Sequence, residues 1–268
     1  MSNPRLPILI AGAGAMGGSL IAGWRRAGSA GPSDMIIVDP EPGPEAREAH
    51  QAGADLNPAP ESLARASTVL LAVKPQIWRT AAQVIAPHLG AETAIVSVAA
   101  GVSAADLGEA FGGRPVARVM PSLAAAIGQG SAAVWSADPK LRWEVQVLFA
   151  PLGVVTALDD EAQMHIATAA GGSAPAYLYA FIEALEAAAV EGGLARATAA
   201  SLVRATITGA AALLRETGED PASLRQRVTS PGGTTEAALK VLLAKSGFPG
   251  LLTKAVKAAA ARSQELGE

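Results

Sequence analysis

The stretch Leu6–Gly17, LPILIAGAGAMG, determines the fold that we expect for the rest of the chain. Its first half, Leu6–Ala11, is a short apolar run of a length that suits a buried strand. Three glycines with G-x-G-x-x-G spacing follow and lead into an expected helix over residues 18–24: Gly12, Gly14 and Gly17. In dinucleotide-binding folds the first glycine allows a tight turn, the second lets the backbone approach a pyrophosphate, and the third lets the helix pack on the strand.

A second strand is expected at Met35–Val38, and it ends at Asp39. An acidic residue about 20 residues beyond the glycines commonly holds the ribose of an adenosine. A carboxylate accepts hydrogen bonds from both ribose hydroxyls and repels a 2′-phosphate, so Asp39 favours NADH over NADPH. The alternative to dinucleotide binding is an ordinary strand–turn–helix in which the glycines only relieve crowding.

Composition narrows the class of protein. The chain has 268 residues, a net charge of −3 and no cysteine, which excludes disulfides and thiolate metal sites. It has no basic run that would indicate nucleic-acid binding. We find no signal peptide and no apolar run of the ~20 residues that span a bilayer. These observations predict a soluble, cytoplasmic protein without a metal site.

Strand and helix patterns alternate up to about residue 160 and predict an α/β domain with a doubly wound, mostly parallel sheet of the Rossmann type. Further strands are expected at residues 68–73, 93–98, 115–120, 130–135 and 154–157. The domain boundaries predicted are 1–160 for dinucleotide binding and 161–268 for a helical domain. Its helices are expected at residues 161–170, 174–192, 198–217, 221–228, 234–245 and 249–266.

The predicted helices of the second domain are rich in alanine and apolar over much of their circumference. Such helices must be buried, and a domain of this size cannot cover them alone. We therefore expect a homodimer through the C-terminal helices, with a higher oligomer left open.

A second motif, TSPGGTT at residues 229–235, lies directly before the helix expected from residue 234. The glycines expose the backbone, the serine and threonines supply hydroxyl groups, and the start of the helix offers free N–H groups. The segment therefore suits the binding of a small carboxylate. The alternative is an elaborate N-cap. The candidate residues for the substrate are Ser230, Gly232, Gly233, Thr234 and Thr235.

The sequence resembles the Δ1-pyrroline-5-carboxylate reductases, the last enzymes of proline synthesis, over nearly its whole length. The segments that carry the resemblance are GAGAMG at 12–17, AVKPQ at 72–76, SVAAGV at 97–102, RVMP at 118–121, GSAPAY at 172–177 and VTSPGGTT at 228–235. The glycine-rich loop is shared by many dehydrogenases, whereas the last two segments are specific.

The resemblance implies a Rossmann domain, a helical dimerisation domain and hydride transfer from NAD(P)H to the imine carbon of a five-membered ring. Backbone N–H groups of Gly233, Thr234 and Thr235 would hold the substrate carboxylate. The Thr235 hydroxyl would orient the ring nitrogen, because a threonine is a poor general acid at neutral pH. Ser230 and Ser173 are further catalytic candidates. The cofactor-binding candidates are Gly12, Gly14, Ala15, Met16, Gly17, Asp39, Val73, Lys74, Pro75, Ala100, Met120 and Pro121.

The chain departs from the family at several positions. Ser122-Leu123-Ala124 stands where Asn-Thr-Pro is usual after Met-Pro, and Gly171 and Ala174 stand where Ser and Gly are usual. The family often has Asn or Ser at the position of Asp39. These changes leave open a reductase of the same fold that acts on another cyclic imine or keto acid, and a non-catalytic dinucleotide-binding protein. A β-hydroxyacid dehydrogenase is disfavoured, because its G-x-x-G-x-G-x-x-x-K segment is absent.

Overall fold

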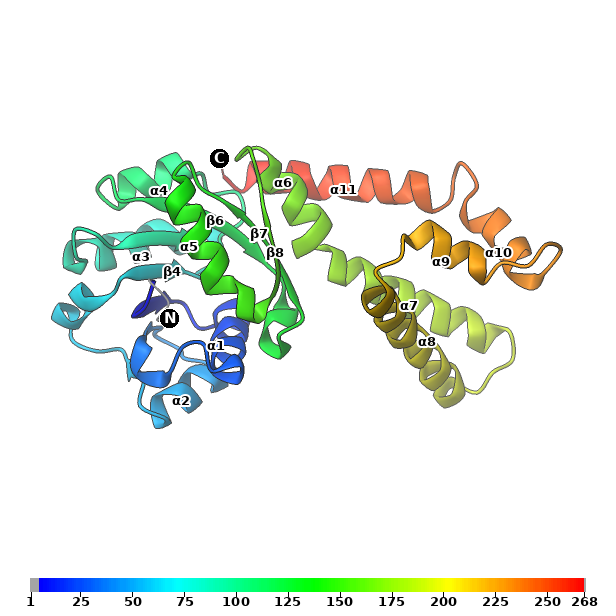
Figure 1. Ribbon diagram of the computed structural model, residues 1–268, viewed down its shortest axis with the longest axis horizontal. Coiled ribbons are helices and arrows are strands. Elements are labelled where there is room, and N and C mark those ends of the chain that lie inside the picture. The colour runs from blue at the N-terminus through cyan, green and yellow to red at the C-terminus, as the bar shows by residue number, and fades with distance from the viewer. Residues whose placement is uncertain (1–4, 268) are drawn as a thin grey trace. The chain divides into compact units, whose positions relative to one another are not determined.

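The computed structural model describes residues 5–267, and its core is one eight-stranded sheet (Figure 1). The strand order is β3-β2-β1-β4-β5-β6-β7-β8, and only the β6–β7 pair is antiparallel. The strands are β1 (Ile8–Ala11), β2 (Met35–Val38), β3 (Asp55–Leu56), β4 (Thr68–Leu71), β5 (Ala94–Ser97), β6 (Val116–Pro121), β7 (Gly130–Trp135) and β8 (Gly153–Ala157). This is the α/β, doubly wound sheet that the sequence predicts.

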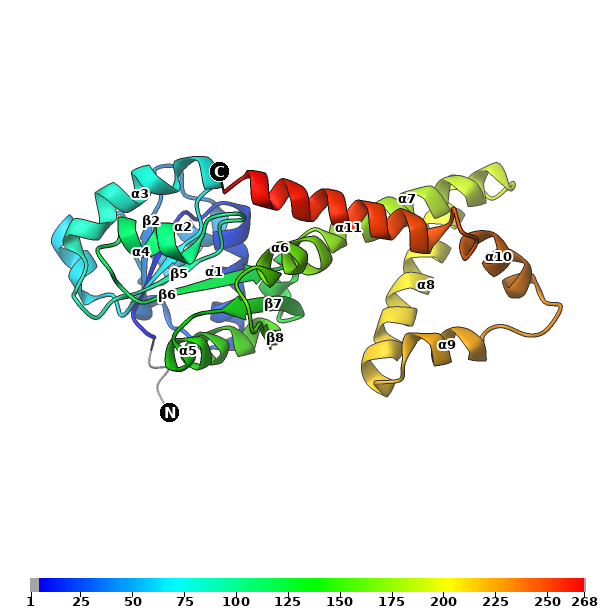
Figure 2. The ribbon, with the colours of Figure 1, turned by 90° about the horizontal axis from the view of Figure 1, so that it is seen from above.

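Helices cover both faces of the sheet, because successive strand residues point to opposite sides. Ile8 and Ile10 pack in one apolar cluster with α1 (Ala15–Ala27), α2 (Pro44–Gln51) and α5 (Pro139–Phe149). Leu9 and Ala11 pack in the other cluster with α3 (Trp78–Ile85) and α4 (Ala104–Ala110). Figure 2 shows α3 and α5 on opposite sides of the sheet. The sheet is therefore buried on both faces, which explains its continuous apolar runs.

Several predicted elements differ from those observed. The segment after Lys74, which the sequence predicts as one helix over residues 76–89, is α3 with a 3-10 turn at each end; Pro87 lacks the N–H that would continue α3 as an α-helix. The expected strand Leu6–Ala11 begins at Ile8. The edge strand β3 was not predicted, since two residues give no periodic signal. Gly171 and Gly172 do not interrupt a helix: α6 (Gln163–Ala167) continues as a π-helix over Thr168–Gly172.

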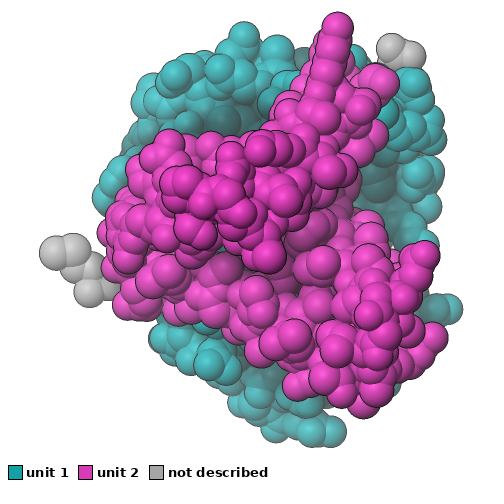
Figure 3. All heavy atoms as spheres, turned by 90° about the vertical axis from the view of Figure 1, so that its right-hand side faces the viewer, with its two compact units in different colours: residues 1–172, 258–268 teal, residues 173–257 magenta. Residues whose placement is uncertain are grey.

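The described chain forms two compact units (Figure 3). One unit extends through Gly172 and includes the chain from Ala258 onward, whereas the other is Ser173–Lys257. The second unit contains α7 (Ala174–Glu191), α8 (Arg196–Thr217), α9 (Pro221–Arg227), α10 (Thr234–Leu242) and the first part of α11 (Phe248–Glu265). Within the described residues, α8 alone has the length and apolar composition that could cross a membrane.

The end of α11 belongs to the sheet-containing unit. Ser263 is 3% exposed there, and its hydroxyl lies 3.1 Å from Nδ1 of His165 in α6. A side chain at Gly101, in the loop after β5, would lie 2.7 Å from the Ser263 carbonyl oxygen. The C-terminal turn of the chain is thus packed against a loop at the carboxyl edge of the sheet.

Candidate functional site

The glycine-rich loop has the geometry that its spacing predicts. Gly12 has φ +93°, and a Cβ there would lie 2.8 Å from the Ala72 carbonyl oxygen of the neighbouring strand's end. A Cβ at Gly17 would lie 2.1 Å from the Gly12 carbonyl oxygen, so only glycine lets α1 sit this close to the turn. A Cβ at Gly14 would meet nothing within 4 Å, and Gly14 caps α1 without a side-chain hydrogen bond. The first turn of α1 therefore presents free N–H groups to open space, as a phosphate site requires.

A cavity of about 700 Å³ opens beside this loop at the carboxyl ends of β1, β2 and β4. In doubly wound sheets ligands bind at this edge. Of the predicted cofactor residues, the ones that line the cavity are Gly12, Gly14, Asp39, Val73 and Lys74. The cavity therefore joins the phosphate-binding loop, the acidic residue after β2 and the loop after β4 in one space.

Asp39 is held by four hydrogen bonds. Its Oδ2 accepts from the backbone N–H of Ala13 in the glycine-rich loop at 2.5 Å, and its Oδ1 accepts from the N–H of Glu41 at 2.7 Å. Asn57 binds both peptide groups of Asp39, accepting from its N–H at 2.9 Å and donating to its carbonyl at 2.8 Å. The carboxylate is thus fixed between the loop and the cavity.

One wall of the cavity was not predicted. It is the exposed side of α3 and the turn before it, where Ile77 is 52% exposed and Val84 62% exposed. Apolar side chains left in water beside Asp39 suit the face of a flat aromatic base. The sequence signal is the spacing of 77, 81 and 84 directly after Lys74-Pro75, which places all three on one side of the helical segment.

Of the other predicted cofactor residues, Ala15, Met16 and Gly17 form the first turn of α1, and the rest lie at or after the ends of β4, β5 and β6. Lys74 is exposed, Ala100 follows β5, and Met120 lies at the end of β6. A Cβ at Gly172 would lie 3.0 Å from the Met120 sulfur, so the π-helical turn approaches the end of β6 closely. The GSAPAY segment therefore begins beside the strand end that carries Met120-Pro121.

The start of α4, after the β5 loop, is anchored by a partly buried ion pair. Arg118 of β6 is 3% exposed, and its Nη1 donates to Glu161 Oε1 at 2.8 Å. The same oxygen accepts from the backbone N–H of Ala104 at 2.7 Å, at the start of α4. Burial first, and the nearby Arg118 charge second, lower the pKa of His165, which lies next to this pair.

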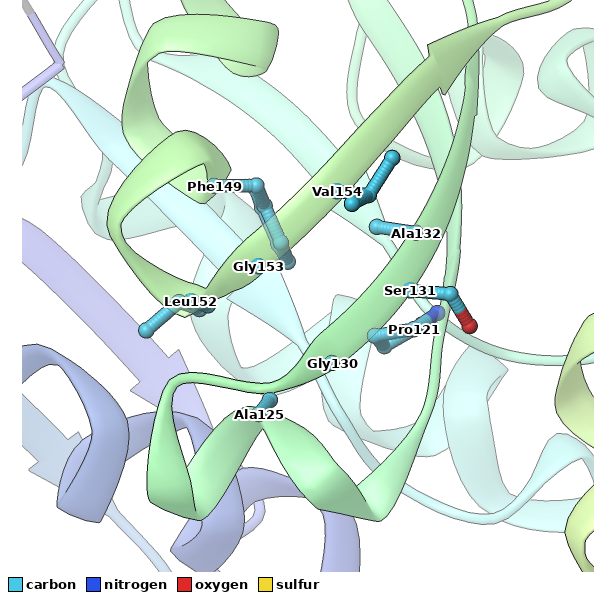
Figure 4. A pocket seen from close by; sticks show the side chains of 9 residues that line it. All are labelled: Pro121, Ala125, Gly130, Ser131, Ala132, Phe149, Leu152, Gly153 and Val154. Atoms are coloured by element: carbon cyan, nitrogen blue, oxygen red, sulfur yellow. The ribbon is translucent and has the colours of Figure 1, made fainter. Parts of the chain in front are cut away.

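The Ser122-Leu123-Ala124 segment has a structural role. Ser122 is buried, its N–H donates to the Ser131 carbonyl at 2.9 Å, and its hydroxyl accepts from the Ser131 N–H at 3.0 Å. Figure 4 shows the small hollow beside it, which Pro121 and Ser131 help to line. This hollow of about 10 Å³ has room for about one water. The Ser122 hydroxyl thus ties the end of β6 to the start of β7.

The TSPGGTT segment forms a turn that leads into α10, with Gly233 as the N-cap. Gly232 has φ +74°, and its N–H donates to Glu236 Oε2 at 2.6 Å. The Gly233 N–H donates to the Ser230 carbonyl at 3.0 Å, so the turn engages it internally. No side chain caps α10. The N–H groups of Thr234 and Thr235 are in its first turn, where an intrahelical acceptor is lacking by geometry.

Ser173 precedes α7, but its side chain makes no capping hydrogen bond. A simple cap does not explain this serine. Among residues 5–267 the structure contains no group of three or more His, Cys, Asp or Glu side chains that could hold a metal ion.

The glycine-rich loop at a helix start, the acid after the second strand and the cavity at the carboxyl edge define an oxidoreductase with a Rossmann-type nicotinamide-dinucleotide domain. Two family models agree. Residues 7–101 match "NADP oxidoreductase coenzyme F420-dependent", and residues 161–266 match "Pyrroline-5-carboxylate reductase dimerisation".

Known proteins resemble the chain over its full length. A pyrroline-5-carboxylate reductase of Pseudomonas aeruginosa is 40% identical over 276 residues, covering 100% of this chain and 98% of the relative. A pyrroline-5-carboxylate reductase structure from Coxiella burnetii has a TM-score of 0.88 at 29% identity, covering 98% of this chain and 99% of that one. The Plasmodium falciparum pyrroline carboxylate reductase with NADP bound has a TM-score of 0.84 at 28% identity, covering 99% of both chains. The chain belongs to the pyrroline-5-carboxylate reductase family.

Proposed function

We propose that this protein reduces 1-pyrroline-5-carboxylate to proline with a nicotinamide dinucleotide as hydride donor. The observation that carries the proposal is the glycine-rich loop opening on the 700 Å³ cavity, in a chain that belongs to this family from end to end. The reaction adds a hydride to the imine carbon and a proton to the ring nitrogen. It yields proline and the oxidised coenzyme.

The residues of the sheet-containing unit hold the coenzyme. The first turn of α1, with Gly14, Ala15 and Met16, binds the pyrophosphate through backbone N–H groups. Asp39 binds the adenosine ribose, and the α3 wall receives the adenine. Further along the carboxyl edge, the nicotinamide end is bounded by residues of the loops after β4, β5 and β6: Val73, Lys74, Pro75, Ala100, Met120 and Pro121. Bound in this way, the coenzyme supplies the hydride.

The TSPGGTT turn holds the substrate. The N–H groups of Thr234 and Thr235 at the start of α10 bind the carboxylate, with Gly233 as the N-cap residue before them, and the Thr235 hydroxyl orients the ring nitrogen. Ser230, Gly232 and Ser173 shape the same site. A protonated imine is already electrophilic, so these groups chiefly orient the ring for hydride transfer. The Glu236 bond to the Gly232 N–H keeps the turn in shape.

NADH is the preferred coenzyme. The Asp39 carboxylate is fixed by the Ala13 and Glu41 N–H groups, and a 2′-phosphate beside it would bring like charges together. Glu41, on the same loop as Asp39, adds a second negative side chain to this part of the cavity, whereas Lys74 lines it from the loop after β4.

The functional form is a homodimer through the helices of residues 161–268. Its support is the set of exposed apolar side chains on the second unit: Leu178, Tyr179, Leu185, Leu194, Leu202, Leu213, Leu214, Val228, Val241, Leu243, Leu251 and Leu252. This many exposed apolar side chains on one unit are typical of a surface that another subunit covers. The α8 helix carries Arg204, paired with Glu186 of α7 at 2.7 Å, which favours a protein partner over lipid. We place this enzyme in the cytoplasm.

Product analysis tests the proposed reaction. The protein is incubated with 1-pyrroline-5-carboxylate and NADH, and the amino acids formed are separated by chiral chromatography. Proline as the product supports the proposal. Turnover of a different cyclic imine, with none of 1-pyrroline-5-carboxylate, overturns it.

A further inference from the structure

Asn57, two residues after the start of β3, has an unusual backbone conformation. Its φ is +47°, and among residues 5–267 it is the one non-glycine residue with a positive φ. L-residues other than glycine reach this region at a cost, and they keep it where surrounding contacts determine it. Contacts of Asn57 should therefore account for its positive φ.

The Asn57 side-chain amide brackets the peptide groups of Asp39. Its Oδ1 accepts from the Asp39 N–H at 2.9 Å, and its Nδ2 donates to the Asp39 carbonyl at 2.8 Å. The backbone N–H of Asn57 also donates to the Ile37 carbonyl at 2.8 Å, which anchors Asn57 to β2. The end of β2 is thereby fixed at three points.

The hydrogen bonds from Asn57 are not needed to satisfy buried peptide groups of Asp39. Asn57 is exposed and Asp39 half-buried, so water could satisfy the same peptide groups. β3 is an edge strand of two residues, both half-buried. The bracket acts on the residue whose carboxylate lines the cavity, and its effect is to fix where that carboxylate lies.

The Asp39 carboxylate keeps acceptor capacity for a ligand. Two carboxylate oxygens offer about four lone-pair positions, and the N–H groups of Ala13 and Glu41 occupy two of them. The remaining positions suit the two hydroxyls of a ribose. They face those hydroxyls correctly only if the Asp39 backbone does not rotate.

We propose that Asn57 is a positioning residue for coenzyme choice: by bracketing the Asp39 peptide groups it holds the Asp39 carboxylate for a ribose 2′,3′-diol and against a 2′-phosphate. This inference rests on the proposed role of Asp39 in binding the ribose. Without the bracket, Asp39 turns away more easily, so the diol loses acceptors and the phosphate meets less repulsion.

The test measures coenzyme affinity with the full-length protein and no substrate. NADH and NADPH are titrated by their fluorescence into wild type, Asn57→Gly, Asp39→Ala and the double variant. Glycine keeps the positive φ and removes only the side chain. Asn57→Asp is a second variant of the same shape that loses the donor to the Asp39 carbonyl. Asp55→Asn, in β3 but without a bond to Asp39, is the matched control.

Asn57→Gly should raise the Kd for NADH by about tenfold, and Asn57→Asp by about threefold, with a change below about twofold for NADPH. In the Asp39→Ala background, Asn57→Gly should add less than about twofold, because the residue acts through Asp39. Equal losses for both coenzymes, or an undiminished loss in the Asp39→Ala background, overturn the inference. If Asp39→Ala leaves NADH affinity unchanged, the role proposed for Asp39 fails as well. If Asp39→Ala weakens NADH binding but Asn57→Gly does not, the inference about Asn57 fails and the role proposed for Asp39 stands.

Discussion

The Asp39 carboxylate accepts a hydrogen bond of 2.5 Å from the backbone N–H of Ala13. One carboxylate thus links the end of β2 to the turn that begins the glycine-rich loop. The two parts of the sequence that signal dinucleotide binding are therefore one physical unit, and a change in one should alter the other.

Asp39→Asn should lower the preference for NADH. The wild type is expected to show a higher kcat/KM with NADH than with NADPH, because a fixed carboxylate favours the ribose diol. The amide removes the charge and one acceptor, so the ratio of the two kcat/KM values should fall about tenfold. Steady-state rates with both coenzymes check this. A wild type that clearly prefers NADPH would contradict the assignment.

Gly17→Ala should abolish coenzyme binding. The new Cβ would lie 2.1 Å from the Gly12 carbonyl oxygen, so α1 or the loop must shift. Isothermal titration with NADH should show a loss of affinity of at least about 100-fold. Gly108→Ala in α4 is the control: its Cβ would make ordinary contact at 3.9 Å with Val116, and alanine should stabilise the helix by up to about 1 kcal/mol.

Glu161→Ala should destabilise the protein. It leaves Arg118, which is 3% exposed, without its carboxylate, and it leaves the Ala104 N–H without an acceptor. We expect a loss of about 2–3 kcal/mol in the free energy of unfolding, measured by denaturant at a fixed protein concentration. Glu161→Gln keeps an acceptor oxygen and should lose about half as much. Equal free energies of unfolding for the wild type, Glu161→Ala and Glu161→Gln would show that the Arg118–Glu161 pair contributes nothing to stability.

Stability should fall below pH 6.5 because of His165. Burial, and then the Arg118 charge, lower its pKa in the folded protein below the ordinary value for histidine, about 6.5. The unfolded chain then binds more protons as pH falls below 6.5, so the free energy of unfolding decreases until the folded pKa is passed. Denaturant titrations from pH 8 to 5 measure this slope. His165→Asn should remove part of this pH dependence. An unchanged slope in the variant would show that other groups cause the loss of stability.

Thr235→Ala should lower kcat about tenfold or more and leave the Kd for NADH within about twofold of wild type. Thr235→Ser should restore most of the rate, because it returns the hydroxyl. The neighbouring Thr234→Ala keeps the backbone N–H group and should have the smaller effect. Equal rates for Thr235→Ala and wild type would exclude the proposed role of the hydroxyl.

The sequence predicts most of the sheet because parallel strands buried on both faces are continuous apolar runs. The sequence also predicts the shape of the glycine-rich loop. A Cβ at Gly12 or Gly17 would collide with a backbone carbonyl oxygen, so the loop requires glycine at both positions. The sequence does not reveal β3 or the bracket of Asn57, since these depend on pairing between distant residues. The sequence shows Ser122 only as a departure from the family pattern, whereas in the structure its hydroxyl accepts from the Ser131 N–H across the β6–β7 pair. Such a contact follows from strand register, which no local pattern reports.

The most direct test of the central claim is the stoichiometry of turnover with 1-pyrroline-5-carboxylate. NADH consumption is followed by its near-ultraviolet absorbance while proline is quantified in the same samples. We predict one proline formed for each NADH consumed, with the rate lowered about tenfold or more in Thr235→Ala. NADH that binds to the protein but is not consumed when 1-pyrroline-5-carboxylate is added would contradict the proposed function.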